Sequence, residues 1–135
     1  MAGFGKPQQS RKIKNQTITS KGEEAVRQSL IAYQQGDLKS AKNILEKTIK
    51  AGQTNSFALG LLATIEKALG NTDRAIELFE KSLKIDQTNP NILHNYSALL
   101  QDKDPKRAIK MSDKSLEISP NNSNYLERNG SLKLK

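Results

Sequence analysis

The sequence predicts an all-α protein built from tandem pairs of helices, and three observations lead to this fold class. The apolar positions are filled mainly by Leu, Ala and Ile with a single Val, whereas strands favour β-branched and aromatic residues. In residues 59–65 and 75–83 the apolar side chains recur at helical spacing. The chain also repeats itself about every 34 residues, a length that suits two helices and a turn.

The internal repeat divides the chain into three abutting units. When the sequence is shifted by 34 residues, the tripeptide Gln-Thr-Asn at 53–55 falls on the same tripeptide at 87–89. The second half of the third copy follows at 33 residues, where Ala75 meets Ala108. The residue lost between 102 and 106 predicts a tight turn there. The predicted units are residues 22–55, 56–89 and 90–122.

Turn and capping residues lie at the expected helix boundaries. Gly-Asp at 36–37 and Gly-Asn at 70–71 separate the two helices of the first and second units. Ser20 and Glu23 have the spacing of a capping box, so we expect Ser20 to cap the first helix. A capping side chain followed by a proline, which starts a helix, occurs at Asn89-Pro90 and Asp104-Pro105.

This pattern resembles the tetratricopeptide repeat (TPR) family, whose 34-residue unit is a helix–turn–helix. The second unit matches well, with Leu59, Leu62-Ala63, Ala75 and Phe79 at the family positions. The small residues of the pattern would let paired helices approach closely. The resemblance covers residues 22–122 and implies a right-handed α-solenoid. Further matches lie at Ser29, Ala41 and Leu45 in the first unit and at Leu93, Tyr96-Ser97, Ala108 and Pro120 in the third.

The two ends of the chain differ from the repeats. Residues 1–21 carry five basic and no acidic side chains, so we expect a disordered basic leader. Such a leader could contact phosphates, but it has no Trp, no Tyr and no Arg-rich interleaving for base stacking, so a nucleic-acid partner is disfavoured. Residues 123–135 begin like another unit. They form either a capping helix or a truncated fourth TPR of a longer array, and we favour the truncated TPR. The capping alternative uses Leu126, Leu132 and Leu134 to cover the last apolar face, with Glu127, Arg128, Lys133 and Lys135 outward.

Several kinds of chemistry lack their residues in this sequence. There is no cysteine, and His94 is the one histidine, so neither a thiol nucleophile nor a histidine metal cluster can form. Glycine-rich phosphate loops are absent, as are long apolar runs and a secretory signal. We therefore expect no enzyme activity, no cofactor, no metal and no membrane insertion, and a cytoplasmic protein of bacterial type.

The remaining function is protein binding, and the resemblance implies where it occurs. The first helices of all units would line a concave groove that holds a peptide or a helix of a protein partner. An apolar partner side chain would be anchored near Tyr33 and Phe57. The alternative is that the chain is the N-terminal TPR region of a longer glycosyltransferase, sulfotransferase or methyltransferase. The predicted groove residues are Glu23, Val26, Leu30, Tyr33, Phe57, Thr64, Lys67, Asn91, His94 and Gln101.

Overall fold

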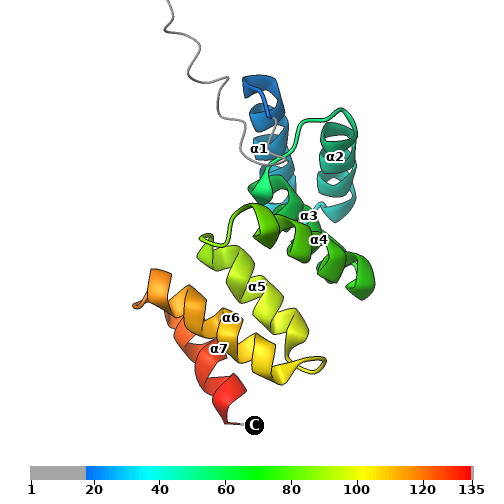
Figure 1. Cartoon of the computed structure of the whole chain (residues 1–135). Coiled ribbons are helices and arrows are strands. Elements are labelled where there is room, and N and C mark those ends of the chain that lie inside the picture. Colours follow the sequence, from blue (N-terminus) through cyan, green and yellow to red (C-terminus); the bar gives the residue numbers. More distant parts are fainter. Residues whose placement is uncertain (1–17, 135) are drawn as a thin grey trace, which may run out of the picture.

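The computed structural model describes residues 18–134, which fold into seven helices joined by short connections (Figure 1). Within this range no strand is formed. The predicted leader lies mostly outside the described residues, but its last part belongs to the fold because the first helix already begins at Ser20. The helices are α1 (Ser20–Gln34), α2 (Leu38–Lys50), α3 (Ser56–Ala68), α4 (Thr72–Ile85), α5 (Pro90–Leu100), α6 (Pro105–Ile118) and α7 (Ser123–Lys133).

The helices are arranged as consecutive pairs along the molecule. The pairs α1–α2, α3–α4 and α5–α6 follow one another from the blue to the orange part of Figure 1, and α7 packs on the last pair. The first helix of each unit contacts the first helix of the next unit, so α1, α3, α5 and α7 form one continuous row. This arrangement confirms the α-solenoid of helix pairs that the repeat predicts.

The turns within the first two units have the same backbone geometry because each contains a glycine at the same place. Gly36 and Gly70 have φ values of 83° and 88°, which only glycine adopts readily. The next residue returns its N–H to the last turn of the helix, from Asp37 to Ala32 O (2.8 Å) and from Asn71 to Glu66 O (2.8 Å). The glycine termination predicted from the sequence is confirmed.

The helix starts agree with the predicted caps at Asn89 and Asp104 and differ from the prediction at α1. Asn55, Asn89 and Asp104 each accept a backbone N–H of the first turn, as N-cap residues do. At α1, however, the N-cap is Thr19 and not Ser20, since the Thr19 hydroxyl accepts the N–H of Gly22 (3.3 Å). Helix α1 begins one residue earlier than the Ser20 pattern indicates because Thr19 also donates its N–H and hydroxyl to Gln53 Oε1 (2.7 and 2.9 Å).

The third unit accommodates its missing residue differently from the prediction. The connection from α5 to α6 contains four residues, 101–104, and is therefore not shortened relative to the three residues 35–37 and 69–71. Instead α5 itself is shorter, with 11 residues against the 13 of α3. Without a glycine in this turn the chain closes through the N–H of Asp104 and the carbonyl of Leu100 (2.8 Å). The prediction of a tighter turn was wrong.

Small residues lie where the two helices of a unit cross. Ala41, Ala75 and Ala108 are completely buried, and so are Ser29, Ala63 and Ser97 on the partner helices. In the first unit the Ser29 hydroxyl donates to the carbonyl oxygen of Ala41 (3.0 Å), which places the two backbones next to each other. The close approach expected from the sequence is confirmed, and the buried hydroxyl is satisfied there.

Helix α3 forms the centre of the core. Ten of its thirteen residues are buried, whereas only three residues are buried in α1 and three in α7. A helix that is apolar all round must be covered on all sides, and α3 contacts α1, α2, α4 and α5. The core is therefore thickest in the middle unit and thinner toward both ends of the solenoid.

Candidate functional site

The row of first helices lies on the inner side of the solenoid. These helices contact one another from unit to unit, whereas within the described residues α2, α4 and α6 do not contact each other. The stack is therefore narrower along the first-helix row, and the row occupies the inside of the curve. We call the surface formed by α1, α3, α5 and α7 the inner face.

The predicted residues of the first two units have different exposures. Glu23 and Phe57 are exposed, and Leu30, Tyr33 and Lys67 are partly buried. Phe57 is 36% exposed, which is unusual for a large aromatic side chain and leaves apolar surface open.

Two of the predicted groove residues lie in the interior and offer little surface to a partner. Val26 is 5% exposed and belongs to the apolar core. Thr64 is also buried, and both functions of its hydroxyl are used within the fold. It donates to the Gly60 carbonyl (2.9 Å) and accepts a hydrogen bond from Asn95 (3.2 Å). The close approach of α3 and α5 buries Thr64, because Gly60 has no side chain to hold the helices apart.

The two predicted residues of α5, Asn91 and His94, and Gln101 at its C-cap are all contacted by side chains of α7. The Tyr125 hydroxyl donates to Asn91, and the Tyr125 ring lies against the His94 ring with centroids 4.8 Å apart. Arg128 donates to Gln101 Oε1 at 2.7 Å. Asn91, His94 and Gln101 therefore share the inner face with Tyr125 and Arg128.

Sequence reasoning missed both residues of α7. At the 33-residue spacing between the starts of α5 and α7, the counterparts of Asn91 and His94 are residues 124 and 127, one position before Tyr125 and Arg128. The sequence interpretation had placed Arg128 on the outer side of a cap. The interpretation of the leucines also needs correction. Leu132 is buried, but Leu126 and Leu134 are 51% and 88% exposed, so neither covers an apolar face. Because α7 packs only against α5 and α6, one stripe of the helix is buried and the opposite stripe is open.

The electrostatics of this region are dominated by cations. Burial, and next the charge of Arg128, lower the pKa of Lys67. Burial also lowers the pKa of His94, and the nearby charges of Arg128 and Lys67 add to the effect. Neither Lys67 nor Arg128 forms an ion pair with a carboxylate among residues 18–134.

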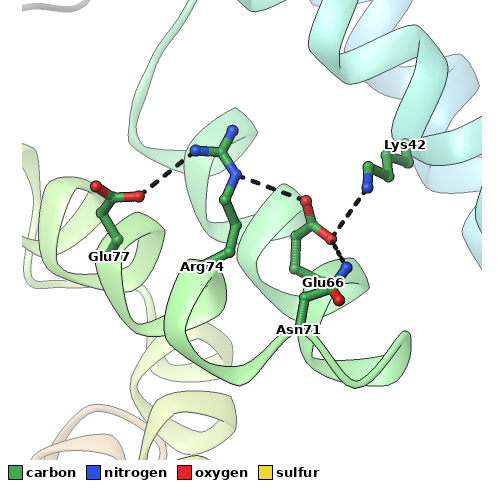
Figure 2. A network of polar contacts seen from close by, with 5 residues as sticks. All are labelled: Lys42, Glu66, Asn71, Arg74 and Glu77. Atoms are coloured by element: carbon green, nitrogen blue, oxygen red, sulfur yellow. Dashed lines mark hydrogen bonds and ion pairs between the residues drawn. The ribbon is translucent and has the colours of Figure 1, made fainter.

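A second polar cluster joins Glu66 on α3 to Lys42 on α2 and Arg74 on α4 (Figure 2). Glu66 is 1% exposed, yet its carboxylate accepts from Asn71 Nδ2 (2.7 Å) and pairs with Lys42 (3.3 Å) and Arg74 (3.7 Å). Arg74 also reaches Glu77 at 3.5 Å. All of these residues except Glu77 line an open depression of about 640 Å³, and none of the ten predicted groove residues lines it. Since Lys42 belongs to the first unit and Glu66 to the second, the network joins two units.

The described part of the chain offers no arrangement for metal-dependent chemistry. Its His, Asp and Glu residues form no group of three or more that could hold a metal ion. Among the helices of residues 18–134, none has the length and apolar composition needed to cross a lipid bilayer. The inner face presents a mixture of apolar, amide and cationic side chains.

Tandem helix pairs with a row of first helices on the inside define a repeat protein of the α-solenoid class. Residues 32–94 match the family model described as tetratricopeptide repeat. The matched segment runs from the end of α1 to the middle of α5, so over this part the chain is similar to the tetratricopeptide repeat family. No curated protein matches its sequence.

Solved structures of low sequence identity share this fold. A structure of pilF from Pseudomonas aeruginosa aligns with a TM-score of 0.74 at 23% identity, over 84% of this chain and 52% of that chain. The type III secretion translocator chaperone SycD of Yersinia enterocolitica has a TM-score of 0.72 at 18% identity, covering 86% and 94%. The structure of Naa15/Naa10 bound to HypK-THB gives 0.71 at 22%, covering 85% and 17%. The chain therefore spans about half of the pilF chain and a small part of the Naa15/Naa10 match.

Proposed function

We propose that this chain is a non-enzymatic scaffold that binds a peptide or a helix of a protein partner on its inner face. The observation that carries the proposal is the combination of exposed Phe57 with partly buried Leu30 and Tyr33 on the first helices. Open aromatic and aliphatic surface of this kind gains free energy when a partner covers it. The names of two structural neighbours, a translocator chaperone and a complex bound to HypK-THB, agree with a role in protein association.

The binding energy is expected to come from apolar anchoring and not from charge. In the first two units the inner face presents Glu23 and Lys67, which are opposite in sign, beside Phe57 and Tyr33. Exposed charges at the rim of an interface contribute little, whereas a truncated aromatic anchor commonly costs about 2 kcal/mol or more. Partner side chains that are apolar should therefore dominate affinity at this end.

A matched pair of variants tests the proposal. Peptide ligands are first selected from a random display library against the whole chain, and their affinities are then measured for Phe57→Ala and Leu69→Ala. Both residues are large apolar side chains of similar exposure, 36% and 38%, but Leu69 lies in the α3–α4 turn. We expect Phe57→Ala to weaken binding about tenfold or more, equivalent to about 1.4 kcal/mol, with Leu69→Ala near wild type.

Two results would contradict the proposal. Equal losses in both variants would mean that the peptides do not use the inner face. Loss of helicity in Phe57→Ala, measured by circular dichroism, would mean that Phe57 is a core residue. Glu23→Ala serves as a further comparison and should change affinity much less than Phe57→Ala.

A further inference from the structure

Three cationic or ionisable side chains from three successive first helices gather at one end of the inner face. Lys67 lies at the end of α3, His94 in the middle of α5 and Arg128 on α7. Besides burial, the positive charges of Arg128 and Lys67 lower the pKa of His94, and the charge of Arg128 lowers the pKa of Lys67. Since no single helix contains the cluster, it exists only when the three units are stacked.

The fold holds two members of this cluster in place. The His94 ring is stacked obliquely on Tyr125, with centroids 4.8 Å apart and an angle of 35° between the planes. The Arg128 guanidinium is oriented by its hydrogen bond to Gln101 Oε1 at 2.7 Å. A side chain fixed by such partners loses little further entropy when it binds a ligand.

The cluster lacks the counter-charge that a half-buried set of cations requires. No carboxylate of the described residues pairs with Lys67 or Arg128, and Glu127, next to Arg128 in sequence, is exposed and unpaired. His94 Nδ1 and Arg128 Nε are buried and have no hydrogen-bond partner within residues 18–134. By contrast, the buried carboxylate of Glu66 is fully partnered. Unpaired buried polar groups in a native protein call for an explanation.

We propose that Lys67, His94 and Arg128 form a carboxylate-binding site that receives an acidic side chain of the protein partner. The proposal rests on the proposed function and adds the chemistry of the bound segment: apolar where it meets Phe57 and acidic where it meets α7. A carboxylate fits because Arg128 still has free N–H groups beside its bond to Gln101, and Lys67 supplies a second donor. Charge-assisted bonds of this kind are the strong ones in partly dry surroundings.

The single histidine provides a local probe. His94 is the only histidine of the chain, so in a tag-free protein the C2 proton of its ring gives one resolved NMR signal. The probe ligand is end-blocked hexaglutamate, and end-blocked hexaglutamine is the uncharged match. Their effect on the His94 signal is followed between pH 5 and 8 at low salt. The groups that face His94 are Lys67 on α3 and Tyr125 and Arg128 on α7.

The expected result is a rise in the His94 pKa when hexaglutamate binds, because a carboxylate stabilises the imidazolium that Lys67 and Arg128 disfavour. Lys67→Gln should weaken hexaglutamate binding at this site about tenfold. Lys81→Gln is the matched control, since Lys81 is an exposed lysine on α4 and its loss changes the net charge equally. In the free protein Lys67→Gln should also raise the His94 pKa, whereas Lys81→Gln should not.

Three outcomes would overturn the site. The first is no response of the His94 signal to hexaglutamate at millimolar concentration, and the second is an equal response to hexaglutamine. The third is an equal weakening in Lys67→Gln and Lys81→Gln, which would indicate unspecific attraction by a basic protein. An equal response to inorganic phosphate would overturn the carboxylate assignment. Because these measurements use neither Phe57 nor a selected peptide, their failure is separate from failure of the scaffold proposal.

Discussion

Glu66 is an acidic residue in the protein interior, where a carboxylate is normally unfavourable. Its carboxylate is almost fully buried, and it is retained because Asn71, Lys42 and Arg74 surround it (Figure 2). A buried charge with partners is tolerated, but removing one member of the set leaves the others unpaired. The contribution of Glu66 therefore depends on the contact between the first and second units.

The first prediction concerns this carboxylate. Glu66→Gln should lower the free energy of unfolding by about 1–3 kcal/mol, since Lys42 loses its counter-charge in a half-buried position. Glu77→Gln is the matched control, because Glu77 is exposed and contacts the same Arg74 (3.5 Å). It should change stability by less than about 0.5 kcal/mol. Urea unfolding of both variants measures the difference, and equal effects would contradict a structural role for the buried network.

The second prediction concerns pH and His94. Burial and then the charges of Arg128 and Lys67 hold the pKa of His94 below its ordinary value of 6.5. The unfolded chain therefore binds the proton more readily than the folded chain, so stability increases with pH through this range. The His94 contribution should be complete above about pH 6.5 and should be lost as pH falls below that value.

Chemical denaturation at several pH values between 5 and 7.5 measures this effect. His94→Gln should flatten the slope in this window, because no other histidine titrates there. An unchanged slope in His94→Gln would contradict the prediction.

The two helices of each pair pack closely because small residues lie where they cross. A substitution at one such residue of α4 tests this packing. Ala75 on α4 is completely buried, so an additional three carbon atoms cannot be accommodated without moving α4. Ala75→Leu should cost about 1–3 kcal/mol through overpacking. Ala68→Leu, at the exposed last residue of α3, is the control and should have little effect. An unchanged denaturation midpoint for Ala75→Leu would mean that the packing of this pair is misassigned.

Helix α7 gives a second test at this scale because it is covered on one side only. Leu132 is 5% exposed and Leu126 is 51% exposed on the same helix. Truncating the buried side chain should cost about 2 kcal/mol or more, and truncating the exposed one should cost little. Hydrogen exchange of α7 amides in Leu132→Ala and Leu126→Ala measures the difference, with faster exchange expected for Leu132→Ala alone.

At the scale of the whole molecule, stability should decrease from the middle of the solenoid toward its ends. Each unit of a repeat protein is stabilised by its neighbours, and α3 is covered from four sides whereas α7 contacts only two helices. Native-state hydrogen exchange should therefore show the strongest protection in α3 and α4 and weaker protection in α1 and α7. Uniform protection across all helices would indicate a single cooperative unit.

Much of the architecture could be predicted from the sequence because its signals are local. The repeat spacing, the glycines at 36 and 70 and the caps at Asn89 and Asp104 each act within a few residues of their own position. The start of α1 was missed by one residue because it depends on Gln53, which is distant in the sequence but adjacent in space. Local patterns therefore located helices well and their exact ends less well.

The series of helix pairs could be read from the amino-acid sequence alone, because helix periodicity, turn glycines and the small residues at helix crossings recur at a constant spacing. Which side chains remain open to solvent could be seen only in the folded chain. The tertiary structure buries Val26 and Thr64, leaves Leu126 exposed and brings Arg128 next to Gln101. The physical reason is that exposure and electrostatic surroundings depend on the rotation of one helix against the next, and residues on α3, α5 and α7 meet only after the units have stacked.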